Sequence, residues 1–124
     1  MQKFIILGAL STVLLMVGCA EKKPATPEEI WKGYCTSIGN AARSITLDRQ
    51  NGITKKEALE YANKVTDPTT KGFVLEYLEK VYALPDAELK ADKDAIQAKF
   101  KNEAYEQCVN TPHDPKKMPY YKPF

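Results

Sequence analysis

The chain has 124 residues, with 18 basic and 16 acidic side chains and a formal net charge of +2. A charge so close to balance gives no electrostatic argument for binding nucleic acid, and we expect no nucleic-acid partner. The six glycines are scattered and form neither a G-x-G-x-x-G pattern nor a Walker loop. The sequence therefore lacks both of these nucleotide-binding motifs.

The first nineteen residues have the features of an export signal. A positive charge at Lys3 precedes an apolar run over residues 4–17, which is short for a bilayer span and is followed by a small residue and a cysteine. The segment Leu15-Met16-Val17-Gly18-Cys19 resembles a bacterial lipoprotein signal, although Met16 stands where such signals usually carry Leu. The resemblance implies a signal peptide over residues 1–18 and lipidation of Cys19 by acyl chains such as palmitate.

Residues 19–25 are polar and are expected to form a disordered tether between the lipid and the domain. Ala20 occupies the position at which Asp usually signals retention in the inner membrane. The resemblance to Gram-negative lipoproteins therefore implies a cell-envelope protein held by its N-terminal lipid, in the outer membrane and facing the periplasm. The 106 residues from Cys19 onward amount to one domain.

With Cys19 assigned to the lipid, Cys35 and Cys108 remain as an even pair in a compartment that permits disulfides. We expect these two to be joined, with two buried free thiols as the alternative. The bond would close a loop of about 74 residues and stabilise the domain by roughly 4 kcal/mol. A zinc site is not expected, because neither cysteine has partners at ligand spacing and His113 stands alone.

Residues 26–110 carry helix signals and no convincing strand, so we expect an all-α domain, a small four-helix bundle or orthogonal array. The segment Thr26-Pro27-Glu28-Glu29 is a capping box that starts the first helix. Gly39 lies inside this helix, where it is expected to admit a neighbouring helix. Asn51-Gly52 is expected to end the helix, with one residue of the pair in the left-handed conformation.

Three further helices are expected. Thr54 and Glu57 form a second capping box, and Asp67-Pro68 ends that helix and caps the third. A fourth helix is expected from about Ala87 to Cys108, with Asp92 as an alternative start. The pairs Glu60/Lys64 and Glu76/Lys80 have the spacing of stabilising charge pairs, and the expected inward side chains of the third and fourth helices are Phe73, Val74, Tyr77, Leu78, Val81, Tyr82, Leu89, Ile96, Phe100, Ala104 and Cys108.

No group of residues points to catalysis. A nucleophile needs a nearby base, and the single histidine, His113, lies in a proline-rich segment where nothing in the sequence fixes its orientation. Adjacent acids such as Glu28 and Glu29 do not face one another on a helix. We therefore expect a protein that is not an enzyme and that uses no cofactor or metal.

Two elements are candidates for contacting a partner. The first is Arg49-Gln50 at the end of the first helix, which is either a structural cap or an exposed contact corner. The second is the proline-rich tail over residues 111–124, which we expect to be extended and either to dock on a partner or envelope surface, to fold back on its own domain, or to be disordered. Its cations and aromatic residues are Lys116, Lys117, Tyr120, Tyr121, Lys122 and Phe124.

The body of the chain also resembles a group of small helical exported proteins of Gram-negative bacteria. That group shares a Cys-x3-Gly-x2-Ala helix, an Arg-Gln-x-Gly turn and a late Cys. The matching residues here are Tyr34-Cys35, Gly39, Ala42, Ile45, Arg49-Gln50, Gly52, Tyr82, Pro85, Phe100, Asn102, Tyr105 and Cys108. The resemblance implies a helical, disulfide-closed domain and no activity.

These observations favour a non-catalytic envelope lipoprotein, a small helical module that binds a protein partner. Two alternatives remain open: a periplasmic holdase chaperone of the acid-activated kind, and an exclusion or immunity lipoprotein. The holdase needs carboxylates that are buried in the folded state, and the sequence shows no evident cluster of them.

Overall fold

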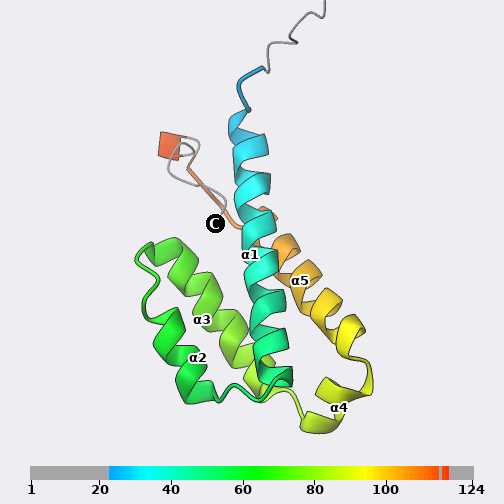
Figure 1. The fold of residues 1–124 in the computed structure, drawn as a ribbon. Coiled ribbons are helices and arrows are strands. Elements are labelled where there is room, and N and C mark those ends of the chain that lie inside the picture. The colour runs from blue at the N-terminus through cyan, green and yellow to red at the C-terminus, as the bar shows by residue number, and fades with distance from the viewer. Residues whose placement is uncertain (1–22, 115, 118–124) are drawn as a thin grey trace, which may run out of the picture.

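The computed structural model describes residues 23–114, 116 and 117 (Figure 1). The described residues form five α-helices in succession and contain no strand. They are α1 (Pro27–Gln50), α2 (Lys55–Ala62), α3 (Pro68–Ala83), α4 (Asp86–Ala91) and α5 (Lys93–Val109). The expected all-α fold is confirmed, while residues 1–18, Cys19 and the first part of the tether lie outside the described residues.

The helical conformation is interrupted at Asp92. The prediction of a single fourth helix from about Ala87 to Cys108 was therefore wrong. Asp92 has an extended backbone, with φ −145° and ψ 96°, and its side chain accepts a hydrogen bond from the backbone N–H of Ala95. The acid thus caps α5 and separates it from the short α4. The alternative start at Asp92 is the one the structure adopts.

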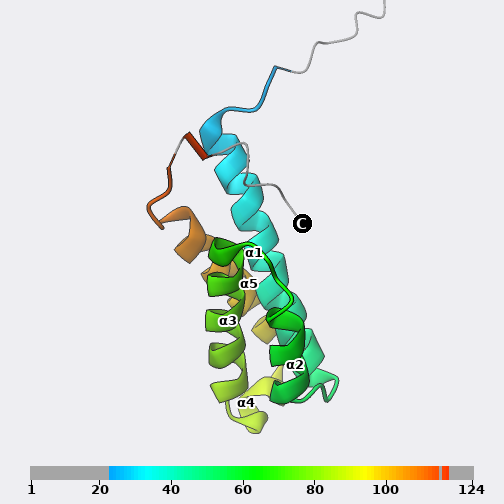
Figure 2. The same ribbon diagram turned by 90° about the vertical axis from the view of Figure 1, so that its left-hand side faces the viewer.

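The long helix α1 is the centre of the domain (Figures 1 and 2). Its most extensive contacts are with α5, which runs antiparallel to it, and α3 packs against it from another side. The short helix α2 packs mainly on α3 rather than on α1. The start of α1 and the end of α5 therefore lie at one end of the domain, and the turn from α1 to α2 lies at the other.

Local signals start and stop the helices as expected. Complete capping boxes join Thr26 to Glu29 and Thr54 to Glu57, and the Asp67 side chain caps α3. Gly52 has a φ of 90°, which confirms that one residue of the Asn-Gly pair is left-handed. These contacts satisfy backbone N–H groups that have no partner within their own helix.

The disulfide between Cys35 on α1 and Cys108 on α5 is confirmed, with the two Cα atoms 5.4 Å apart. Both half-cystines are fully buried in the main core, which joins α1, α3 and α5. The buried members of that core are Trp31, Tyr34, Cys35, Ile38, Ala42, Phe73, Tyr77, Val81, Phe100, Ala104 and Cys108. A smaller cluster, formed by Ala58, Ala62 and Leu78, holds α2 on α3.

None of the helices within the described ranges has the length and apolarity needed to cross a membrane.

Candidate interaction surfaces

The end of α1 is tied into the domain by Arg49. Its guanidinium donates a hydrogen bond to the carbonyl oxygen of Val81 and lies 3.1 Å from Asp86 Oδ1. The guanidinium carbon also lies 5.5 Å from the centre of the Tyr82 ring. Through these contacts Arg49 links α1 to α3 and α4. Its side chain is only 12% exposed, so it does not form an exposed contact corner.

Gln50 is also used inside the domain. Its side-chain nitrogen donates to the Lys93 carbonyl oxygen at 3.1 Å, and its oxygen accepts from Gln97 Nε2 at 2.7 Å. Gln97 is buried and has a second contact, 3.4 Å from Arg43 Nε. This chain of amides fixes α5 against the last turns of α1.

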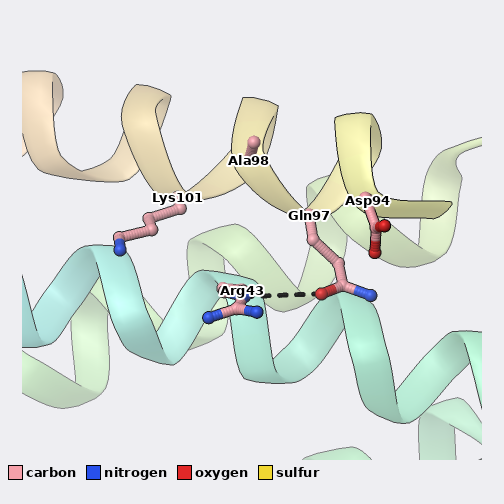
Figure 3. A pocket seen from close by; sticks show the side chains of 5 residues that line it. All are labelled: Arg43, Asp94, Gln97, Ala98 and Lys101. Atoms are coloured by element: carbon pink, nitrogen blue, oxygen red, sulfur yellow. Dashed lines mark hydrogen bonds between the residues drawn. The ribbon is translucent and has the colours of Figure 1, made fainter. Parts of the chain in front are cut away.

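A cleft of about 360 Å³ lies beside this amide chain, between α1 and α5 (Figure 3). Arg43 and Lys101 bring positive charge to it, and Asp94 brings negative charge. Arg43 is already bonded to the Gln97 oxygen. The cleft therefore carries mixed charge and does not form a dedicated anion site.

The start of the tail is held against α1. The His113 ring stacks on Trp31, with ring centres 4.3 Å apart and planes 14° apart. Its Nδ1 lies 3.1 Å from the Thr111 carbonyl oxygen and its Nε2 lies 3.8 Å from Glu28 Oε2. The expectation that nothing orients His113 was therefore wrong, because a stacking surface and two polar groups fix the ring.

Lys116 and Lys117 are both exposed, and they come three and four residues after His113. Their short turn is held by the Asp114 side chain and carbonyl, which accept from the Lys116 and Lys117 backbone N–H groups at 2.9 Å. The other candidate residues of the tail, Tyr120, Tyr121, Lys122 and Phe124, lie outside the described residues.

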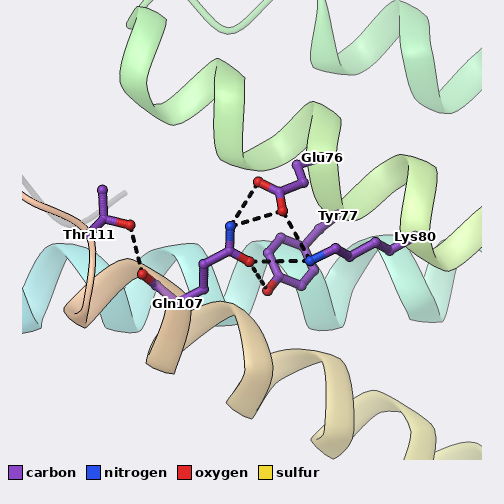
Figure 4. A network of polar contacts seen from close by, with 5 residues as sticks. All are labelled: Glu76, Tyr77, Lys80, Gln107 and Thr111. Atoms are coloured by element: carbon purple, nitrogen blue, oxygen red, sulfur yellow. Dashed lines mark hydrogen bonds and ion pairs between the residues drawn. The ribbon is translucent and has the colours of Figure 1, made fainter.

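A polar network ties α3 to α5 near the chain end (Figure 4). Gln107 donates to both carboxylate oxygens of Glu76 at 2.9 Å and accepts from the Tyr77 hydroxyl at 2.7 Å. Lys80 lies 3.0 Å from Glu76, so the predicted Glu76/Lys80 pair forms. Lys64 instead lies over the Tyr61 ring, and the described residues show no ion pair between it and Glu60.

The network shifts the protonation of its members. Hydrogen bonding from Gln107 and the pairing with Lys80 lower the pKa of Glu76. The same carboxylate raises the pKa of Lys80, while burial raises the pKa of Tyr77. These shifts favour a charged, paired Glu76 and Lys80, which is the state of a structural tie between two helices.

An apolar groove runs between α1 and α2, with α3 as its floor. We call it the α1–α2 groove, and it has a volume of about 240 Å³. Its rim carries Tyr61, which is 64% exposed, and Asp48. Sequence reasoning missed it, because it arises from the way α2 leans on α3. The lining residues are Ala41, Ser44, Ile45, Asp48, Ala58, Tyr61, Ala62, Val65, Val74 and Leu78.

Among the described residues, no three His, Cys, Asp or Glu side chains converge as metal ligands would. Comparison with protein-family models, curated proteins and solved structures finds no match to the chain. The chain's own residues are therefore the basis for its proposed function.

Proposed function

We propose that this protein is a non-catalytic lipoprotein of the bacterial envelope, a small helical module that is anchored by Cys19 and binds a protein partner. The lipoprotein-like segment before Cys19 supports the anchor. The fold supports the proposal of a single helical module, because α1, α3 and α5 share one core and the Cys35–Cys108 bond joins two of these helices. We propose the outer membrane, facing the periplasm, as its location.

The observation that carries this proposal is that the chain enters and leaves the domain at the same end. Thr26 caps the first turn of α1, and His113 packs on Trp31 one turn further along that helix. Both the proposed tether and the start of the tail therefore belong to the anchored end. The helix α1 has 24 residues and spans about 36 Å, so the α1–α2 turn lies about that far from the residue at which the proposed tether enters the domain.

The contacts of the polar side chains support a binding role over catalysis. His113, Arg49 and Gln107 each have partners inside the domain that fix their position. In each case the partners join two segments of the fold. A general base needs a substrate proton within reach, and a ring stacked on Trp31 beside Glu28 serves packing instead.

The acid-activated holdase gains no support from the fold. Every Asp and Glu among the described residues is exposed, so protonating them relieves little buried charge. A circular dichroism titration separates the two functions. We expect a compact helical domain down to about pH 2, whereas loss of tertiary packing with gain of apolar dye binding in acid would favour the holdase.

The partner is tested by purification of the full chain from envelopes at native expression level, compared with a variant that lacks residues 118–124. This deletion leaves His113 on Trp31, so the domain keeps its core. A single stoichiometric partner retained by the full chain and reduced with the deletion is the expected result. Equal recovery of the partner with both forms would show that residues 118–124 do not contact it. Recovery of many unrelated proteins would contradict the proposal that the protein binds one specific partner.

A further inference from the structure

We propose that residues 118–124 of this chain bind in its own α1–α2 groove. The groove is the most apolar of the described surface hollows, and the alanines Ala41, Ala58 and Ala62 line it. Small side chains leave depth for a larger one to enter. This inference concerns contacts within one chain and does not depend on the proposed function.

The size of the groove fits a side chain rather than a free ligand. Sites for small molecules typically enclose about 300–1,000 Å³, and the α1–α2 groove encloses about 240 Å³. Segment 118–124 reads Met-Pro-Tyr-Tyr-Lys-Pro-Phe and contains no acid. Its prolines favour an extended chain that presents aromatic side chains singly, as recognition of such segments requires.

The tail starts within reach of the groove. His113 is fixed on Trp31, and the Lys117 backbone N–H bonds to the Asp114 carbonyl oxygen, so the last described residue lies one short turn after the His113 contact. Ala41, at the near end of the groove, lies ten residues along α1 from Trp31, or about 15 Å. In an extended polyproline-type chain the four residues from Met118 to Tyr121 cover about 12 Å, and the length of the Tyr121 side chain adds to that reach.

The groove and the segment also carry opposite charges. Asp48 stands on the groove rim beyond Ile45, further from Trp31 along α1. Lys122 is the one charged residue of the segment and follows the two tyrosines in sequence. If Tyr120 or Tyr121 lies near Ala41, the segment continues along α1 in the direction of Asp48. The Lys122 ammonium is then attracted to the Asp48 carboxylate.

Covalent connection favours this occupant over a second copy. A short linker raises the local concentration of the attached segment to the millimolar range, whereas a second copy of the chain has to reach the groove by diffusion. A filled groove would also shelter the partly exposed Ile45, Val65 and Val74 from water.

The test uses the full chain with the photo-crosslinking residue p-benzoylphenylalanine in place of Tyr121, followed by mass spectrometry of the products. We expect most crosslinks to lie within one chain, on the groove residues of α1, α2 and α3. The Val65→Asp variant should lower that yield about tenfold, because an apolar segment then has to cover a carboxylate. Leu47→Asp is the matched control, since Leu47 is 43% exposed and lies outside the groove lining.

A second measurement places the crosslinker in the groove, so that the test does not depend on correct folding of the Val65→Asp variant. The crosslinker replaces Tyr61, which is exposed on the groove rim and tolerates a larger ring. Capture of the peptide containing residues 118–124 from the same chain is the expected result. Crosslinks mainly to other faces of the domain, to a second copy of the chain, or to other molecules would overturn the proposal.

Discussion

Gly39 on α1 faces the backbone carbonyl of Lys101 on α5 so closely that a Cβ at position 39 would lie 2.8 Å from that oxygen. A separation this short cannot be relieved by rotating a side chain, because the opposing atom belongs to the backbone of a helix. The tight packing of α1 on α5, which also brings Cys35 to Cys108, therefore requires glycine at position 39.

We expect Gly39→Ala to destabilise the domain by about 1–3 kcal/mol, since α5 must move away from α1. Gly72→Ala is the matched control, because no atom lies within 4 Å of a Cβ built at position 72 in the interior of α3. That change should stabilise the domain by up to about 1 kcal/mol through helix propensity. Urea unfolding followed by circular dichroism measures both, and a loss of equal size at the two glycines would contradict the packing.

Replacing Cys35 and Cys108 together by Ala should cost about 4 kcal/mol of unfolding free energy. The bond joins residues 73 apart in sequence, so it restricts most of the unfolded chain. Thermal unfolding of the variant, compared with the parent before and after reduction, checks this. A reduced parent as stable as the oxidised one would show that the bond adds little.

The Arg49 and Asp86 variants should differ although the two residues form one ion pair. Arg49→Met loses a charged hydrogen bond to the Val81 carbonyl in a partly buried setting, which costs about 1–3 kcal/mol. Asp86→Asn should cost less than about 1 kcal/mol, because the Asp86 side chain is 78% exposed. Equal losses in denaturant titrations of the two variants would assign the stabilisation to the ion pair instead.

Glu76→Gln should weaken the domain near neutral pH and have little effect in acid. The pKa of Glu76 is lowered in the folded state by Gln107 and Lys80, so its carboxylate contributes stability above the unfolded-state value near 4.5. That contribution is lost as the pH falls through the lower folded-state pKa. The difference should stay below about 1 kcal/mol, because the side chain is partly exposed.

Parallel pH series of unfolding free energies for the parent and Glu76→Gln measure this effect. Glu60→Gln is the control, since Glu60 is exposed and has no ion pair among the described residues. A parent–variant difference that stays constant from pH 7 to pH 3 would exclude the network as its origin.

The local parts of the fold could be predicted from the sequence. Thr26, Thr54 and Asp67 bond to backbone N–H groups three residues away, so a short stretch of sequence contains both partners. The disulfide could be predicted as well, once Cys19 was set aside. Asp92 was ambiguous, because a charged stretch can continue a helix or cap a new one, and the side-chain bond to Ala95 resolves it.

The candidate surfaces could not be predicted in the same way, because they depend on which helices pack together. Gln107 reaches Glu76 across the α3–α5 contact, and no spacing in the sequence relates the two residues. His113 looked unconstrained because its stacking partner, Trp31, lies at the other end of the domain sequence. The α1–α2 groove exists because Leu78 and its neighbours hold α2 on α3 and leave the side of α1 uncovered.

The proposed role as a dedicated interaction module is tested most directly by crosslinking in intact envelopes, with the protein at its native level and the products identified by mass spectrometry. We predict one dominant partner in stoichiometric yield from the anchored protein. A broad set of unrelated proteins that grows under acid or heat, or the absence of any crosslinked protein, would contradict it.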